Sequence, residues 1–391
     1  MDKLFEIVDA EVGFGNVATG GSLGYDCPET GGLVATPFTS EYQDVISAHA
    51  PSLVTIDVQR AVGIAGASNA TYSGTPVRCW INDHQIGMLS HASQRTPYIN
   101  LPRGRYVLEM DTMNRDGNCK HTLWLVRETP DLEQDRLAVV TVGCYSRHDL
   151  ADELRWLFAS AAKHGMLVHV EGVNEAFGNF YTRKVECVFE RMAALPDVYS
   201  HAIYVDGRDA MIVASESEIK KKLDMIGGSV IGTESCSWPL DEDEEWAKAF
   251  TGPTEWVYPQ AGNWGGRLNG IGSILETLVE VMKLHYRLKH GTGPGWLYKP
   301  DGSPRYNPWD DQFMWQALVR SGYEPLKRDM EWSLFACPTC TGVDVTNPRY
   351  KFHSGRLIVD GYRAPCAIHL SGAGKRFMNL WGHFLGAEYG R

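Results

Sequence analysis

The chain has 391 residues and a formal net charge of -11, with 43% hydrophobic and 22% charged residues. This length exceeds the usual size of a single hydrophobic core, so we expect two domains, and the ordinary composition excludes a wholly disordered chain. The acidic balance argues against a protein whose surface is coated with basic residues for nucleic-acid binding, although a local basic groove is compatible with it.

The sequence shows no sign of a membrane or secreted protein. No stretch approaches the roughly 18 consecutive apolar residues of a membrane helix, and the N-terminus lacks the basic and then apolar order of a signal peptide. Nine scattered cysteines are typical of reduced thiols in a cytosol. We therefore expect a cytoplasmic protein, in host cytoplasm if the chain is viral. Cys337 and Cys340 form the one tight pair, which could belong to a zinc or redox site but more simply has a structural role.

Residues 1–135 are predicted to form a β-rich domain with a glycine-rich arm. The arm covers residues 13–32, which have no apolar period. Short alternating runs follow, at residues 52–58, 76–81, 106–110 and 121–126, and they predict a small β-sandwich. Trp80, Tyr98 and Trp124 could stack on sugar rings there, although core positions are the simpler interpretation.

Residues 136–391 are predicted to form an α/β domain. The polar segment 129–136 marks the boundary, and the continuous apolar run 137–142 after it suits a buried parallel strand. A helix over residues 150–161, a strand over 166–170, a helix over 184–192 and a strand over 201–205 follow. This βαβαβ order predicts a mostly parallel sheet with right-handed crossovers.

Two segments have the residue types of a metal and phosphate site. Asp206 and Asp209 follow the third strand, where ligands of α/β sheets bind. Their carboxylates suit Mn²⁺ or Mg²⁺, which could neutralise a departing diphosphate, although the same spacing occurs in ordinary turns and caps. Residues 369–375 combine an imidazole, a small-residue turn and a lysine, which suit a metal and phosphate oxygens or an ordinary loop.

Two predicted helix starts add further polar groups. Residues 269–272, Asn-Gly-Ile-Gly, open an amphipathic stretch, and such a glycine-rich start can cradle an anion or admit a sugar, or simply follow a turn. Asp310 and Asp311 stand at the start of another helical stretch, where acidic residues are favoured in any case.

Taken in order, these segments resemble the glycosyltransferase domain of procollagen lysyl hydroxylases and related collagen glycosyltransferase-like proteins. The resemblance spans residues 137–378, and it is carried by residues 140–142, 184–185, 204–212, 234–239, 268–272, 310–313 and 369–375. It implies a GT-A fold, which is a Rossmann-like α/β domain with a mixed, mostly parallel sheet. It also implies transfer of a hexose, with glucose favoured, from a UDP-sugar in the presence of Mn²⁺.

The resemblance assigns a role to each matched residue. Asp206, Asp209 and His369 match the metal ligands, with Gly372 and Lys375 near the diphosphate. Val142, Cys144 and Lys184 match positions around the uridine or its phosphates. The donor-sugar and acceptor side is matched by Glu234, Trp238, Asn269, Asp310 and Asp311.

Mechanism and acceptor stay open at the level of sequence. An inverting reaction needs a carboxylate base, for which Asp311, Asp310 and Glu234 are candidates, whereas the retaining reaction that the resemblance favours does not. The acceptor could be hydroxylysine-type protein, or a hydroxymethylated DNA base in a viral or bacterial enzyme. Such a base would be flipped onto aromatic residues of segment 254–264 or of the N-terminal domain. The alternative from another class is a non-catalytic nucleotide-sugar or glycan-binding module with a degenerate transferase fold.

Overall fold

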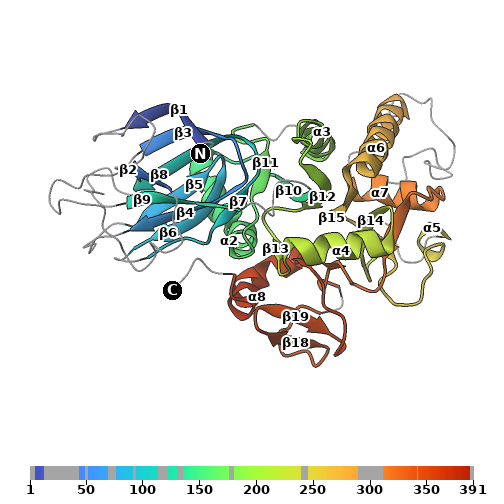
Figure 1. Ribbon diagram of the computed structural model, residues 1–391. Helices are drawn as coiled ribbons and strands as arrows, with labels where there is room; N and C mark the ends of the chain where they lie inside the picture. Colours follow the sequence, from blue (N-terminus) through green and yellow to red (C-terminus); the bar gives the residue numbers. More distant parts are fainter. Residues whose placement is uncertain are drawn as a thin grey trace, which may run out of the picture. The chain divides into compact units, whose positions relative to one another are not determined.

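The computed structural model describes residues 5–12, 44–48, 52–68, 76–90, 94–112, 122–129, 135–175, 180–238, 245–288, 311–340 and 342–387 (Figure 1). The predicted glycine-rich arm lies outside these residues. The chain divides into two compact units, of which the first comprises Met1–Arg136, Phe158–Val168 and Glu388–Arg391 and the second comprises Leu137–Leu157 and His169–Ala387. Among the described residues, none of the helices combines the length and the apolar character that crossing a bilayer requires.

The first unit contains two antiparallel sheets. One has the order β1-β3-β8-β5-β6 and the other the order β2-β9-β4-β7. In chain order the strands are β1 Phe5–Val12, β2 Asp44–Ala48, β3 Ser52–Val58, β4 Val62–Ser68, β5 Val77–Ile81, β6 His84–Leu89, β7 Ile99–Leu101, β8 Gly104–Thr112 and β9 Thr122–Glu128. Apolar side chains of both sheets form one buried cluster, which confirms the predicted β module and its sandwich-like core.

The aromatic residues of this module serve its interior. Trp80 is 3% exposed and Trp124 is fully buried, so neither can stack on a sugar, in agreement with the simpler interpretation. Tyr98 is half-buried, and the Arg127 guanidinium lies over its ring at 4.0 Å from the ring centroid.

A buried imidazole joins the segment Phe158–Val168 to the β-sheets of the same unit. His84 Nε2 lies 3.1 Å from the Phe158 carbonyl oxygen, and the Val168 N–H donates to His84 Nδ1 at 3.1 Å. Because Nδ1 accepts, Nε2 carries the proton and the ring is neutral. Burial lowers the pKa of His84 to about 3, which keeps this arrangement intact at neutral pH.

The second unit is built on a nine-stranded sheet with the order β11-β10-β12-β15-β14-β17-β20-β13, and β16 pairs with β14. The strands are β10 Arg136–Val142, β11 Val168–Glu171, β12 Tyr199–Val205, β13 Ala210–Ile212, β14 Ser229–Glu234, β15 Tyr258–Arg267, β16 Leu326–Asp329, β17 Phe335–Ala336 and β20 Ala367–His369. β14 is parallel to β16 and β17, whereas β15 is antiparallel to β12 and β14. The sheet is therefore mixed, as predicted for this domain.

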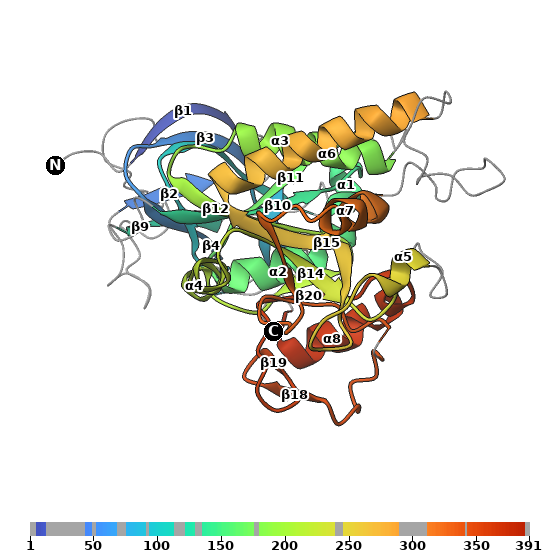
Figure 2. The same cartoon turned by 90° about the vertical axis from the view of Figure 1, so that its right-hand side faces the viewer.

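Helices cover both faces of the sheet. Figures 1 and 2 show α3 and α6 on one face and α4 on the other. The helices are α1 Arg147–Glu153, α2 Arg155–Lys163, α3 Phe180–Ala193, α4 Glu216–Ile226, α5 Glu245–Lys248, α6 Leu268–Leu288, α7 Asp311–Arg320 and α8 Met378–Leu385, with a 3-10 helix η4 at Gly372–Phe377. Apolar residues of α3, α6 and α7 pack with β10, β12, β14 and β15 in one cluster. The hairpin of β18 Tyr350–His353 and β19 Arg356–Val359 packs with α8 in a second cluster.

The structure corrects the predicted single helix over residues 150–161. The helical stretch is divided into α1 and α2 at Leu154, whose φ of -101° and ψ of 9° interrupt the helix. The Leu154 side chain lies against the backbone of Gly207. The apolar spacing continues through the break because residues on both sides of it are buried, so periodicity alone could not show it.

The segment 254–264 is also corrected. Most of it belongs to β15, an inner strand of the sheet, and Trp256 and Trp264 are only 1% and 5% exposed. Trp256 stacks on Trp332 with ring centroids 4.0 Å apart, and Trp264 stacks on Tyr204 at 5.2 Å. These two aromatic residues stabilise the core and cannot receive a flipped base.

Candidate metal and nucleotide site

The turn between β12 and β13 carries two carboxylates. It consists of residues 206–209 and follows β12, whose last carbonyl group accepts a hydrogen bond from Thr141 Oγ1 at 2.7 Å. A Cβ on Gly207 would lie 2.9 Å from Thr141 Oγ1, so only glycine fits where the turn passes β10. This packing holds Asp206 and Asp209 at the carboxyl end of β12.

Strand pairing brings a histidine to these carboxylates. In the ladder of β13 and β20, Ala210 lies opposite His369, and the Leu370 N–H donates to the Asp209 carbonyl oxygen at 2.8 Å. The histidine, which lies far away in the sequence, is therefore placed beside Asp209 by backbone hydrogen bonds.

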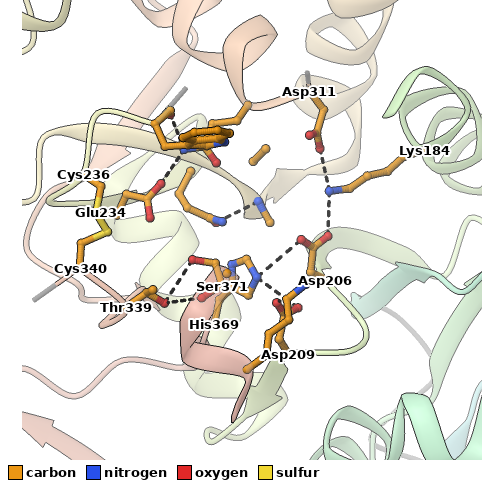
Figure 3. Close-up of a pocket in the computed structure, with 17 residues that line it drawn as sticks. Lys184, Asp206, Asp209, Glu234, Cys236, Asp311, Thr339, Cys340, His369 and Ser371 are labelled. Carbon is orange, nitrogen blue, oxygen red and sulfur yellow. Dashed lines mark hydrogen bonds and ion pairs between the residues drawn. A yellow bond between two sulfur atoms is a disulfide. The ribbon is translucent and has the colours of Figure 1, made fainter. Parts of the chain in front are cut away.

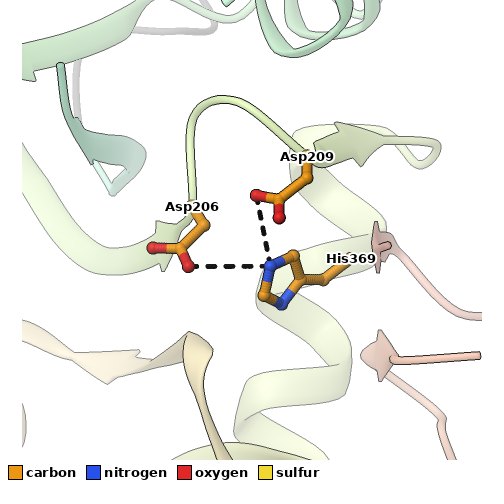
Figure 4. Close-up of side chains that lie close together, drawn as sticks. All are labelled: Asp206, Asp209 and His369. Carbon is orange, nitrogen blue, oxygen red and sulfur yellow. Dashed lines mark ion pairs between the residues drawn. The ribbon is translucent and has the colours of Figure 1, made fainter. Parts of the chain in front are cut away.

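The three side chains form a compact group of metal-ligand types (Figure 4). Their ligand atoms lie within 4.8 Å of one another, and His369 Nε2 is 3.3 Å from Asp209 Oδ1 and 3.6 Å from Asp206 Oδ2. The imidazole is buried, and neither of its nitrogens has a hydrogen-bond partner of good geometry among the described residues. A buried imidazole that faces two carboxylates in this way fits a divalent cation.

The absence of a side chain at Gly262 on β15 makes room for Asp206 and His369. The Asp206 N–H donates to the Gly262 carbonyl oxygen at 2.8 Å, so the two backbones are in direct contact. A Cβ at Gly262 would lie 2.2 Å from His369 Cε1 and 2.8 Å from Asp206 Oδ2. Any residue larger than glycine would therefore displace two of the three candidate ligands.

Electrostatic interactions favour the ionised carboxylate. Burial opposes ionisation of Asp206, but Lys184 and then His369 lower its pKa below the ordinary value. Burial also opposes protonation of His369, yet Asp209 raises the pKa of this imidazole well above its ordinary value. Binding of a divalent cation would displace that proton, because a metal-bound imidazole is neutral.

A second cation borders the group on the side of η4. Lys375 Nζ lies 3.2 Å from Asp209 Oδ2, and the lysine side chain is 48% exposed. Gly372 begins η4 with a positive φ of 52° and nothing lies within 4 Å of its missing Cβ. An anion could approach the exposed ammonium group over this open backbone.

Lys184 lies on the side of Asp206 that faces away from His369 (Figure 3). Its Nζ is 2.8 Å from Asp206 Oδ1 and 2.7 Å from Asp311 Oδ2. Tyr204 adds a hydrogen bond from its hydroxyl group to Asp206 Oδ1 at 2.5 Å. Burial disfavours the charged lysine, but Asp206 and Asp311 raise its pKa well above the ordinary value, so this ammonium group is charged.

Glu234, at the end of β14, forms a third wall. Gln312 Nε2 donates to Glu234 Oε1 at 2.6 Å and to the Trp238 carbonyl oxygen at 2.8 Å, and the Cys337 thiol donates to Glu234 Oε2 at 3.4 Å. Burial raises the pKa of Glu234 to about 7, which is suitable for proton transfer near neutral pH. Trp238 is 67% exposed, and its ring is available for stacking.

A disulfide corrects the prediction of reduced, unpaired thiols. Cys236 is bonded to Cys340, with the two Cα atoms 5.8 Å apart. Thr233 of β14 lies beside Ala336 of β17, so the segments that follow these parallel strands run close together. Cys340 consequently meets Cys236 and not its near neighbour Cys337, whose thiol is free.

A cavity of about 330 Å³ unites these side chains. Its lining includes the predicted residues Lys184, Asp206, Asp209, Glu234, Trp238, Asp311, His369, Gly372 and Lys375. Val142, Cys144 and Asn269 do not line it; Asn269 is exposed and its Oδ1 accepts from the Gly270 N–H. Asp310 lies outside the described residues.

Several residues of the site were not found from the sequence. Gln260 and Gly262 lie on β15, and Tyr204 and Cys337 contact predicted residues from behind. Gln260 Oε1 accepts from the Gly262 N–H at 2.9 Å. Gln260 and Gly262 have no local motif, because their place in the site depends on the register of β15. Tyr204 and Cys337 stand in segments that the sequence singled out, but their contacts with Asp206 and Glu234 depend on tertiary packing.

The chain was compared with protein families, curated proteins and solved structures. No protein-family model matches the chain, and no curated protein matches it. A solved structure described as a glycosyltransferase involved in the glycosylation of the major capsid of PBCV-1 is similar with a TM-score of 0.36 and 10% sequence identity. The alignment covers 63% of this chain and 98% of that one. Because function resides in the site, the residues described above carry the functional interpretation.

Proposed function

We propose that this protein is a divalent-metal-dependent glycosyltransferase with a GT-A fold that transfers a hexose from a UDP-sugar to a hydroxyl group. The observation that carries the proposal is the buried group of Asp206, Asp209 and His369 beside the exposed Lys375 ammonium. A cation site next to an exposed lysine is suited to a diphosphate, because the cation and the ammonium group both neutralise its charge. The order of the segments that resemble collagen glycosyltransferases supports the same activity.

The residues of the cavity would have three tasks, which are binding the cation, binding the diphosphate and stacking on a sugar. Asp206, Asp209 and His369 would hold Mn²⁺ or Mg²⁺, which when bound would supply positive charge to the UDP leaving group. Lys375 would bind the diphosphate oxygens from the solvent side, since its side chain is 48% exposed. Trp238 would stack on a sugar ring with its exposed face.

Two carboxyl groups are candidates for contact with the acceptor. Glu234 has a pKa of about 7 and could accept a proton from an acceptor hydroxyl group in an inverting reaction. Asp311 lines the same cavity and would orient hydroxyl groups in either stereochemical course. The burial of Trp256 and Trp264 removes two predicted stacking partners of a flipped DNA base and leaves Trp238 as the exposed aromatic residue of the cavity. Hydroxylysine-type protein and hydroxymethylated DNA are therefore both tested as acceptors.

Release of UDP tests the proposal directly. The wild-type protein, Asp209→Ala and the exposed-surface control Asp197→Ala are incubated with a panel of UDP-sugars and Mn²⁺. Each is given hydroxylysine peptides or hydroxymethylated DNA as acceptor. We expect turnover that requires Mn²⁺, persists in Asp197→Ala and is lost in Asp209→Ala. Nucleotide binding without turnover on any donor and acceptor would refute the enzyme and identify a binding module.

A further inference from the structure

Lys184 is buried between two carboxylates that belong to different elements. It extends from α3, while Asp206 follows β12 and Asp311 opens α7. The lysine and Asp311 side chains are 7% and 8% exposed, and Nζ lies 2.8 Å and 2.7 Å from the two carboxylate oxygens. Figure 3 shows the ammonium group between them.

The contacts of Asp206 are divided between its two oxygens. Oδ1 accepts from the Tyr204 hydroxyl group at 2.5 Å and contacts Lys184 Nζ, whereas Oδ2 faces His369 Nε2 at 3.6 Å. The ammonium group and the phenol therefore fix the rotation of the carboxylate. They leave Oδ2 directed towards the group of metal-ligand types.

Removal of the ammonium group would take away the cation that the two carboxylates share. Both carboxylates approach the same Nζ atom within 2.8 Å, and their side chains are 28% exposed for Asp206 and 8% exposed for Asp311, so without the ammonium group they would repel each other where solvent screens them only in part. Loss of one partner of a buried ionic group is strongly destabilising for this reason.

We propose that Lys184 is a positioning residue, which holds Asp206 and Asp311 together and directs Asp206 Oδ2 to the cation site. The inference rests on the proposed function in so far as this group binds a divalent cation. It differs from a role as a phosphate ligand, because the ammonium group is already engaged by two carboxylates inside the protein. Lys375 provides the contrast, since its side chain is 48% exposed beside Asp209.

Three variants test the role of Lys184 in the absence of metal and nucleotide. Lys184→Met keeps the apolar stem and removes the charge. Lys184→Met combined with Asp311→Asn also removes the repulsion. Lys375→Met removes the other lysine of the site. We expect Lys184→Met to lower the thermal unfolding midpoint by roughly 6 °C or more, the double variant to recover most of that loss, and Lys375→Met to unfold like the wild type.

Binding of Mn²⁺ alone, measured by calorimetry, provides the second readout. Removal of a positive charge by itself would strengthen cation binding, so weaker binding reports a misplaced Asp206. We expect Lys184→Met to bind Mn²⁺ at least about 10-fold more weakly than the wild type. Lys375→Met, which also removes a positive charge but leaves the contacts of Asp206 in place, should bind Mn²⁺ at least as tightly as the wild type and lose affinity for UDP.

The outcomes separate the two roles. Lys184→Met with wild-type stability and Mn²⁺ affinity but weaker UDP binding would overturn the proposal, and so would a loss of stability that Asp311→Asn fails to recover. If Lys184→Met does not fold, a folded double variant supports the proposal and an unfolded one overturns it. If these results hold and no UDP-sugar is turned over, the proposed function fails while the positioning role stands.

Discussion

Replacement of Gly262 by alanine tests whether the Asp206, Asp209 and His369 group is a metal site. The new methyl group would lie 2.2 Å from His369 Cε1, 2.6 Å from His369 Nδ1 and 2.8 Å from Asp206 Oδ2. Contacts this short cannot persist, so the imidazole, the carboxylate or β15 must move. The His369 side chain is 2% exposed, so the space open to it is the cavity that it lines.

The magnitude follows from the size of this displacement. Insertion of a methyl group into a packed region costs typically about 1–3 kcal/mol of folding stability. The strain is relieved by moving ligand atoms out of position, and misoriented ligands weaken metal binding about 10–100-fold. We therefore expect a modest loss of stability together with a large loss of Mn²⁺ affinity.

Gly272→Ala is the matched control. Gly272 lies in α6, with nothing within 4 Å of its missing Cβ, so alanine there should be neutral or stabilise the helix by up to about 1 kcal/mol. Mn²⁺ affinity is measured by calorimetry, and the free energy of unfolding by urea titration in the presence of a chelator. Wild-type Mn²⁺ affinity in folded Gly262→Ala would refute the metal site.

Further predictions concern the parts that support the site and the first unit. Burial lowers the pKa of His84 to about 3, below its unfolded value of about 6.5. Stability present above pH 6.5 should therefore decrease on acidification, by about 2 kcal/mol at pH 5. Urea titrations should show a steeper dependence of the unfolding free energy on pH for the wild type than for His84→Asn, and equal dependences would contradict a buried neutral ring. Asp329 accepts three backbone N–H groups and a serine hydroxyl group, so Asp329→Asn should lose about 1–3 kcal/mol, and no change in urea midpoint would count against this role. The bond between Cys236 and Cys340 joins residues 104 apart in the sequence, so a reductant should lower the unfolding free energy of the wild type by about 2–4 kcal/mol. It should leave the variant with both cysteines replaced by serine unchanged. A wild type insensitive to reductant would show that the bond does not form.

Local patterns were sufficient for the first strands and most of the first helices of the second unit. The apolar run of β10 and the helical spacing in α3 predicted a strand and a helix because both depend on near neighbours in sequence. The break at Leu154 was missed since the apolar spacing continues through it. The role of Trp256 and Trp264 was missed for a different reason, because aromatic residues occur both in hydrophobic cores and on binding surfaces, and residue type does not distinguish the two.

Candidate ligands were partly accessible from the sequence. Asp206 and Asp209 are close in sequence and follow a recognisable strand, so their proximity could be predicted. His369 was suggested by resemblance, and its place depends on the pairing of β13 with β20. The partners of Lys184 could not be predicted, because the choice between a phosphate and two carboxylates depends on how α3, α7 and β12 pack.

The sequence by itself determined the α/β order of the second unit, the β character of the first and the two carboxylates at a strand end. These properties follow from periodicity, turn residues and short-range spacing. Tertiary structure decided that Cys340 pairs with Cys236, that Gly262 makes room for His369, and that Lys184 joins Asp206 to Asp311. Each of these contacts joins residues far apart in the chain, and their distances are set by strand register and helix packing, which local sequence does not specify.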